Sequence, residues 1–447
     1  MIAPTQSSAA PNVSAALASF EAQWLARESD ALSALRAQAM QRFLELGLPT
    51  MRDESWRYTN LRELAAQSFV DAPRAAAGAV EPSASLALTG GAERAATVLM
   101  VNGHPVLPRT MDSALKGLEI ISLSELSRTE PNRLMDYLGP LPEAEEARWR
   151  LLNTALFVDG LYLKVRAKVE RPLIILHVAT AEIPGTAAYP RVIIDASASS
   201  SATIIEQHVE QGSETPLCNS ATLLVLERDA ELEHYRVFAT GNRSVHLDSL
   251  EIRQERGSRC KQFTVALGGA LVRASLDAYL NQPNAQLASY SLLVGHEARH
   301  IDCVNVVRHS ARETSSRQTA RSIASGTSRV IVNSKVVVDA GASHTESQQS
   351  CHGLLLSPSA EIDSRPQLEI YTDDVKCSHG ATTGRLDPNM LFYMLARGLD
   401  RQTAQSLLIF AFLADVLSGM SVASARAAIE SALICRLPDS QLLREFR

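Results

Sequence analysis

Residues 288–307 read ASYSLLVGHEARHIDCVNVV, which is two short runs of β-forming residues joined by the polar segment GHEARH. A similar run, SRVIVNSKVVVDA, occupies residues 328–340. Comparable runs begin near Phe157 and continue to about Val375, and no convincing helical segment interrupts them. Short apolar runs bounded by small and polar residues are typical of strands. The sequence therefore predicts a mainly β region of about 220 residues.

Two common β architectures fit this pattern poorly. An α/β sheet needs a crossover helix of about a dozen residues between parallel strands, and none is predicted here. A β-sandwich normally marks its hairpins with turns such as Asn-Gly, whereas Ser, Thr and Ala dominate these connections. Short strands of similar spacing with small residues at the corners favour a parallel β-helix, although the sequence contains no strict repeat.

The regions on either side are expected to be helical. Val13–Leu46 carries apolar residues at helical spacing, which predicts one or two amphipathic helices. Ala75–Ala96 is rich in Ala, Gly, Ser and Pro and is expected to be a loose connection. After Asp387-Pro388, a helix-start signal, the chain becomes helical again. Within that region Ser406–Leu417 is interpreted as a buried helix, too short to cross a bilayer.

These features divide the chain into three parts. Residues 1–155 form a largely helical N-terminal region with a flexible Ala/Gly/Pro-rich connection, residues 156–386 form the parallel β-helix, and residues 387–447 form a C-terminal helical domain. The first and last coils of a β-helix expose apolar faces and unpaired backbone groups. We therefore expect the two helical regions to cap its ends.

The composition narrows the functional classes. The 447 residues include 43 Lys+Arg and 49 Asp+Glu, and the formal charge of −6 argues against general nucleic-acid binding. The six scattered cysteines form no CxxC pair, and the first residues do not read as a signal peptide. We expect a cytoplasmic protein with reduced thiols and no membrane span.

Few catalytic motifs are present. No GxxxxGK[ST] loop is found, which argues against ATP hydrolysis by this chain, and neither GxGxxG nor GxSxG occurs. His296 and His300 match the HExxH pattern of zinc peptidases, but that pattern requires a helix. In a strand, two residues four apart stand ~13 Å from each other. A zinc peptidase and an exported β-helix carbohydrate-active enzyme are the alternative functions.

The richest candidate site is YTDDVKCSHGATTG, residues 371–384. In a strand, Cys377 and His379 point the same way, with Cα atoms ~6.6 Å apart. Thiolate plus imidazole suits iron or an iron–sulfur cluster, yet two ligands do not complete a site of four, so another chain would supply the rest. The structural alternative is a buried cysteine beside a hydrogen-bonded histidine.

The other histidines and cysteines give weaker signals. Cys351 and His352 are adjacent, and adjacent residues of a strand face opposite sides. Six further histidines lie singly in β-runs and are interpreted as structural residues: His177, His208, His234, His246, His309 and His344.

Several segments carry a family resemblance: GLPTMRDESWRYTNL (47–61), SLLVGHEARHIDCVNVVRHSARETSSRQ (291–318) and LLLSPSAEIDSRPQLEIYTDDVKCSHGATTG (354–384). Together they resemble the SufB/SufD family of iron–sulfur cluster assembly proteins, and the first and last segments are most similar to the SufD branch. The resemblance extends from about residue 43 to residue 420.

This resemblance implies a right-handed parallel β-helix between helical terminal regions and the role of a non-enzymatic scaffold. It implies pairing with a SufB-like subunit through the β-helix and binding of a SufC-like ATPase through the C-terminal helices, between Asp387 and Leu417. ATP would act only through that partner. It also implies that His379 helps to hold a transient cluster shared with the partner subunit, with Cys377 the weaker candidate ligand.

Some features stay open at this point. Residues 340–356 depart from the family pattern at His344, Cys351 and His352, and VIVNSK lacks the usual glycine before Lys335. The sequence also leaves open whether the isolated chain is a homodimer, which an exposed sheet edge would allow, and whether it binds iron or a flavin.

Overall fold

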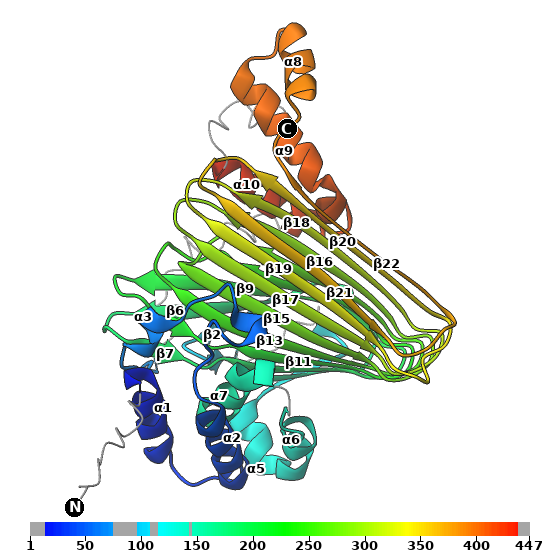
Figure 1. Cartoon of the computed structure of the whole chain (residues 1–447). Coiled ribbons are helices and arrows are strands. Elements are labelled where there is room, and N and C mark those ends of the chain that lie inside the picture. The colour runs from blue at the N-terminus through cyan, green and yellow to red at the C-terminus, as the bar shows by residue number, and fades with distance from the viewer. Residues whose placement is uncertain (1–13, 75–95, 108–114, 143–144, 437–447) are drawn as a thin grey trace, which may run out of the picture.

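The central part of the chain is a parallel β-helix built from two long sheets that face each other (Figure 1). The computed structural model describes residues 14–74, 96–107, 115–142 and 145–436. One sheet has 12 strands and the other 10, and the chain alternates between them through the helix. The predicted mainly β fold with helical flanks is confirmed.

The two sheets run the full length of the β-helix. The 10-stranded sheet contains, in spatial order, β3 (His104–Val106), β2 (Ala96–Val101), β6 (Leu173–Ala181), β9 (Ser201–Gly212), β12 (Glu231–Phe238), β14 (Arg259–Ala266), β16 (Gln286–Gly295), β18 (Ser315–Ala324), β20 (Thr345–Leu355) and β22 (Val375–Gly384). The main path of the 12-stranded sheet contains β4 (Leu118–Ser122), β5 (Leu161–Val165), β8 (Arg191–Ala196), β11 (Ala221–Leu226), β13 (Val245–Gln254), β15 (Leu271–Leu280), β17 (His300–His309), β19 (Arg329–Val338) and β21 (Glu361–Ile370). Three short strands lie beside its early turns: β1 (Val70–Asp71), β7 (Thr186–Ala188) and β10 (Leu217–Cys218). From β6 and β8 onward, each strand on the main path of its sheet pairs in parallel with the previous strand of that sheet, whereas the β2–β3 and β4–β5 pairs at the N-terminal end are antiparallel.

The turns of the β-helix differ in length, which explains why the sequence shows no strict repeat. Gln262 pairs with Ser289 one turn later, and Gln318 pairs with Gln349 one turn later, but the second of these turns contains more residues than the first. Because side chains alternate along a strand, every second residue of each strand points into the interior. Paired residues of successive turns therefore stack into columns that run along the axis of the helix.

One row of corners uses left-handed backbone instead of hairpin turns. Ser199, Asp229, Asn284, Glu313 and His344 have φ angles between 58° and 64°, and each lies between a strand of the 12-stranded sheet and the next strand of the other sheet. Gly257 takes the same kind of position with a φ of 68°. Glycine adopts this left-handed conformation without the steric cost that a Cβ would bring.

The N-terminal helices cover the outer face of the 12-stranded sheet at its early turns. Ile193 and Leu223 point outward from β8 and β11 and share one apolar cluster with Phe43 and Trp149. The elements of this region are α1 (Ala15–Leu25), α2 (Ser33–Leu46), η1 (Glu54–Trp56), α3 (Arg62–Ala65), α5 (Leu123–Thr129), α6 (Pro131–Leu138), η5 (Glu145–Ala147) and α7 (Arg148–Leu156). Residues 13–46 were predicted to form one or two helices, and the structure has two, α1 and α2. The connection expected at Ala75–Ala96 lies outside the described residues, apart from its last residue, which begins β2.

The C-terminal region consists of α8 (Pro388–Ala396), α9 (Arg401–Ser418) and α10 (Ala423–Arg436). Ile409 and Leu413 of α9 pack with Phe263 and Leu292 on the outer face of the 10-stranded sheet, and α8 projects away from the β-helix (Figure 1). The helix expected at residues 406–417 is confirmed as part of α9, but only one of its faces is buried, and Ala411, Ala414 and Asp415 are exposed. Among the described residues, no helix is long and apolar enough to cross a membrane.

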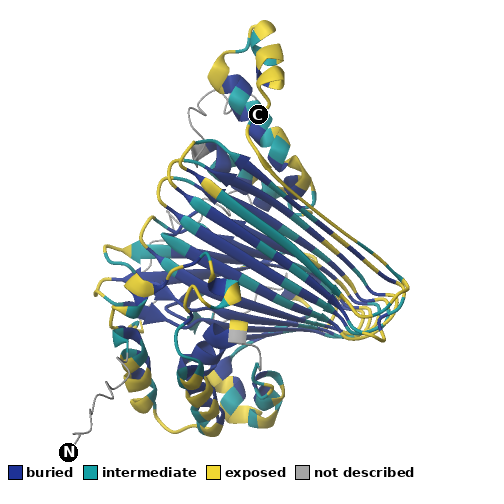
Figure 2. Ribbon diagram, viewed as in Figure 1, coloured by how far each residue is buried: buried dark blue, intermediate teal, exposed yellow. Residues whose placement is uncertain are grey.

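The expectation that the C-terminal helices cap the end of the β-helix is wrong. These helices lie along the side of the 10-stranded sheet, and the last strand, β22, is exposed over most of its length (Figure 2). The apolar surface that α9 and α10 bury comes from the outer face of this sheet rather than from its last turn. The C-terminal end of the β-helix therefore presents an open edge.

Candidate functional site

Cys377 and His379 both lie on β22, the last strand of the 10-stranded sheet. They are two residues apart in the strand, so their side chains leave the same face, as predicted. Cys377 pairs with Ser347 of β20 and His379 pairs with Gln349. Because Ser347 and Gln349 are buried in the interior, both candidate ligands belong to interior columns at their last position.

His379 ends a column of buried polar side chains. In successive turns this column contains Gln262, Ser289, Gln318 and Gln349, all of them buried, whereas His379 is exposed. The amide of Gln349 donates to the backbone oxygen of Ser334 at 3.0 Å, and the Ser334 hydroxyl donates to Oε1 of Gln318 at 2.6 Å. The polar interior of the β-helix therefore reaches its open end at His379.

Cys377 is half-buried and packs against the apolar cluster of the interior. Burial raises the pKa of its thiol, while the backbone N–H of Ser347 acts in the opposite direction. A metal ion bound at this sulfur would therefore have to displace a proton. Since Cys377 and His379 supply only two donors, they can form half of a four-ligand site, and the exposed edge leaves room for donors from another chain.

Cys351 and His352 point to opposite faces of β20. Cys351 is buried in an interior cluster, whereas the His352 ring contacts the Thr382 hydroxyl at the neighbouring, outward-facing position of β22. The opposite orientation predicted for this pair is therefore confirmed. His344 lies at an exposed corner, where its Nδ1 is 3.0 Å from Oδ2 of Asp374.

The HExxH match does not lie on a helix. Residues 296–299 form the corner between β16 and β17, with Glu297 at a φ of 57°, and His300 is the first residue of β17. The ring of His300 contacts the Thr59 hydroxyl at 2.9 Å. The two imidazoles are therefore not presented on one helical face, which is the arrangement that a zinc peptidase of this type requires.

A buried group of ligand-type side chains was missed by the sequence analysis. His177, Glu206 and His208 lie together inside the early turns, and His208 also lies near Cys218 and His246. His177 and His234 each contact the Glu206 carboxylate, at 2.9 and 2.8 Å. These contacts agree with the structural role that the sequence predicted for both histidines. The spacing of these residues along the chain could have revealed the group. His208 follows His177 by one turn of the β-helix, and His246 follows Cys218 by one turn.

Comparisons with known proteins cover nearly the whole described chain. The family model for the SufBD protein N-terminal region matches residues 17–175, and the model for the SufBD core domain of SUF system FeS cluster assembly matches residues 177–412. The chain is 30% identical to the iron-sulfur cluster assembly protein SufD of Escherichia coli K12 over 427 residues, which is 94% of this chain and 95% of the relative. It is 27% identical to an iron-sulfur cluster assembly SufBD family protein of Synechocystis over 88% of each chain. It is 26% identical to the chloroplastic protein ABCI7 of Arabidopsis thaliana over 64% of this chain and 62% of the relative.

Proposed function

Because this chain belongs to the SufBD family of iron–sulfur cluster assembly proteins, we propose that it is a non-catalytic scaffold subunit, similar to SufD. It pairs with a SufB-like subunit through the open end of its β-helix and docks a SufC-like ATPase through its C-terminal helices. His379, with Cys377 as the second candidate, supplies part of the ligand set for a nascent cluster that passes through the complex as cargo. ATP acts only through the partner ATPase.

The observation that carries this proposal is the open edge formed by β22. Among the described strands, β22 pairs only with β20, so one row of its backbone N–H and C=O groups faces outward. An unpaired strand edge is a template for a strand of another chain. A partner that extends the sheet would stack its next turn directly onto Cys377 and His379. In the absence of a SufB-like subunit, a second copy of this chain could use the same edge.

The donor chemistry agrees with a shared cluster. Thiolate and imidazole are ligands of iron–sulfur clusters, and both side chains lie at the last position of an interior column. The pair is incomplete on its own, which fits a cluster that is built at an interface and handed on rather than kept. The compartment that we propose is the cytoplasm, where the five cysteines of the described residues, all free, would stay reduced.

The C-terminal helices offer a surface for the ATPase. Met390, Phe392 and Tyr393 of α8 expose between 57% and 71% of their surface. Large apolar side chains gathered on one short helix are typical of a protein interface. A shallow groove beside Tyr393, lined by Met394 and Leu408, continues this surface onto α9.

The docking helices are tied to the sheet that carries the candidate ligands. Asp415 of α9 forms an ion pair with Arg321 of β18, and the Arg321 guanidinium also lies over the ring of Phe412, 5.8 Å from its centre. β18 is separated from β22 only by β20. We propose that nucleotide binding brings two ATPase copies together, moves α8 and α9, and shifts the contact at the open edge as a rigid-body change.

The experiment that tests this function compares His379→Ala with His344→Ala in the three-subunit complex. Both histidines are exposed and lie near the same end of the β-helix, but only His379 ends an interior column. We expect both variants to copurify with the SufB-like and SufC-like subunits, and only His379→Ala to lose at least ten-fold in bound iron and sulfide. Wild-type cluster content in His379→Ala would contradict the ligand role. Failure of the wild-type chain to copurify with these partners would contradict the scaffold role.

A further inference from the structure

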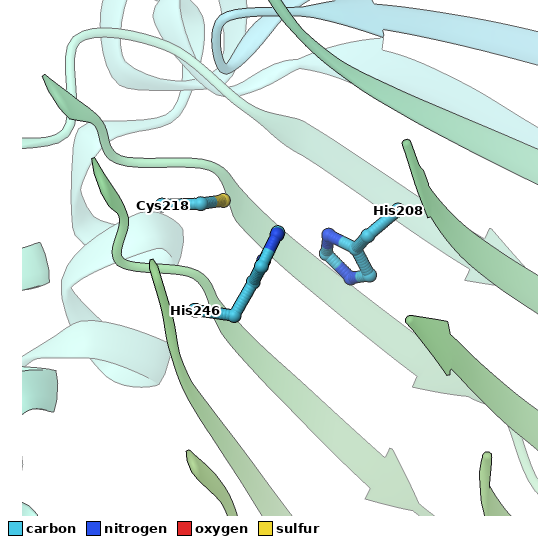
Figure 3. Close-up of side chains that lie close together, drawn as sticks. All are labelled: His208, Cys218 and His246. Atoms are coloured by element: carbon cyan, nitrogen blue, oxygen red, sulfur yellow. The ribbon is translucent and has the colours of Figure 1, made fainter. Parts of the chain in front are cut away.

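His208, Cys218 and His246 come together inside the early turns of the β-helix (Figure 3). His208 lies on β9 of the 10-stranded sheet, while Cys218 of β10 and His246 of β13 are parallel partners in the facing sheet. One ligand atom of each lies within 4.8 Å of the others, and all three residues are buried. The group thus spans the interior from one sheet to the other.

His246 is the least satisfied member of this group. Neither of its ring nitrogens has a hydrogen-bond partner among the described residues, and Nδ1 of His208 also has none. Only 1% of the His246 surface is exposed, so water does not replace these bonds from outside. Buried polar atoms are nearly always paired, because an unpaired one loses its hydration without compensation. Two imidazoles that point unpaired nitrogens into the interior indicate a missing ligand.

The protonation states of the two imidazoles suit a positively charged ligand. Burial lowers the pKa of His246 to about 4 and that of His208 well below its usual range, so both rings are neutral at pH 7. Burial raises the pKa of the Cys218 thiol to about 12, partly opposed by the Ser220 hydroxyl. An ion that binds here would therefore displace the thiol proton, as structural zinc ions do.

The available space also fits a single ion. A small cavity adjoins the three side chains, with a volume of about 10 Å³, and Met100 and His177 line it as well. Metal–nitrogen and metal–sulfur bonds of ~2.1 and ~2.3 Å place tetrahedral ligand atoms about 3.5 Å apart. The ligand atoms of this group would have to move together by about 1 Å or less, and the cavity leaves the fourth position to a water molecule.

We propose that His208, Cys218 and His246 bind one transition-metal ion of the zinc type and thereby join the two sheets at the early turns. Two neutral imidazoles and one thiolate form a borderline-soft donor set that suits Zn²⁺. This site lies many strands from Cys377 and His379 and does not depend on the proposed function.

Cobalt(II) is the probe for this site, because a cobalt ion bound by a thiolate has a charge-transfer absorption band in the near ultraviolet. The full chain would be produced without a histidine tag in cobalt-supplemented medium and then purified. We expect about one cobalt per chain together with that band, and we expect one equivalent of Zn²⁺ to displace it. Absence of the band in the wild-type chain would overturn the proposal, and a band that excess Zn²⁺ does not displace would overturn the zinc assignment.

Variants identify the residues. Cys218→Ala and His246→Phe are expected to lose the band and at least ten-fold in bound metal. Cys260→Ala is the matched control, because Cys260 is equally buried, burial raises the pKa of its thiol to the same value of about 12, and it belongs to no group of metal-ligand side chains in the described residues. This control is expected to keep both the band and the metal. Metal should also raise the Tm of the wild-type chain but not that of Cys218→Ala. Retention of the band by Cys218→Ala would overturn the assignment.

Discussion

His379 lies in parallel register with Gln349, whose buried Oε1 atom has no hydrogen-bond partner among the described residues. The residues stacked beneath them in the same column are covered by the following turn, whereas His379 lies at the exposed end. At this end of the β-helix, as far as the structure describes the chain, the backbone edge of β22 is therefore unpaired, and no further turn covers the interior column that ends at His379. The first prediction concerns that edge.

Ala381→Lys should disrupt pairing at the open end. Ala381 is exposed on β22 and lies on the same side of the strand as Cys377 and His379, so a lysine here places a charge where a partner would stack its next turn. We expect the dissociation constant for a SufB-like subunit to rise about 100-fold, which corresponds to about 3 kcal/mol. Any homodimer of the isolated chain should also become monomeric by analytical ultracentrifugation. The control is Ala198→Lys, at an exposed corner; equal pairing by both variants would contradict an interface at β22.

Phe392→Ser should weaken binding of the SufC-like ATPase. Phe392 exposes 71% of its surface on α8, so the substitution removes an apolar anchor without opening a cavity in this chain. Loss of a central aromatic contact costs about 2 kcal/mol, or roughly 30-fold in the dissociation constant, which calorimetry with the purified ATPase would measure. Leu25→Ser is the matched control, because Leu25 is 70% exposed on α1, in the N-terminal region. Unchanged affinity in Phe392→Ser would place the docking surface elsewhere.

Asp302→Ala should destabilise the chain strongly. Asp302 forms a buried ion pair with Arg273 and accepts a hydrogen bond from the Thr59 hydroxyl, and the Arg273 guanidinium lies over the ring of Trp56, 3.7 Å from its centre. Removing one partner of a buried pair leaves the other charge unpaired, at a cost of about 3–5 kcal/mol. Urea denaturation would measure this loss.

The comparison for Asp302→Ala is Glu231→Ala, which removes the exposed ion pair with Arg259. An exposed pair contributes about 1 kcal/mol or less. A similar decrease in the free energy of unfolding for both variants would contradict this prediction. The contacts of Asp302 and Arg273 with Thr59 and Trp56 would then not hold residues 47–61 to β15 and β17.

His309→Gln should reduce the loss of stability in mild acid. His309 is buried between the hydroxyls of Thr314 and Ser316, each 2.8 Å from a ring nitrogen, and burial lowers its pKa to about 4, with Asp339 partly opposing. The unfolded chain has a histidine pKa of about 6.5, so between these two values it binds a proton that the folded chain does not. This part of the stability is therefore complete above about pH 6.5 and is lost as the pH falls toward 4.

Between pH 7 and pH 5, the free energy of unfolding should fall by about 2 kcal/mol more in the wild type than in His309→Gln. Urea titrations at the two pH values would measure the difference. His344→Gln, at an exposed corner, should behave as the wild type does. The same pH dependence in His309→Gln and wild type would show that His309 is not held neutral in the folded chain.

Much of the fold could be predicted because it depends on local patterns. Short apolar runs bounded by small and polar residues marked the strands, and the missing crossover helices argued against an α/β sheet. Helical spacing located α1 and α2, and an apolar stretch after the helix-start signal Asp387-Pro388 located α9. The position of the C-terminal helices could not be read in this way. Ile409 and Leu413 form an apolar face on α9, but an apolar face does not say whether it covers the end of the β-helix or the side of a sheet.

The candidate site could also be predicted only in part. The sequence alone determined that Cys377 and His379 share one face, because residues two apart in a strand always do. Only the tertiary structure decided that His379 ends the column of Gln349, and that His208 meets Cys218 and His246 across the interior. The physical reason is that successive turns differ in length, so the stacking register is set by how each corner packs on the previous one and not by a period in the chain.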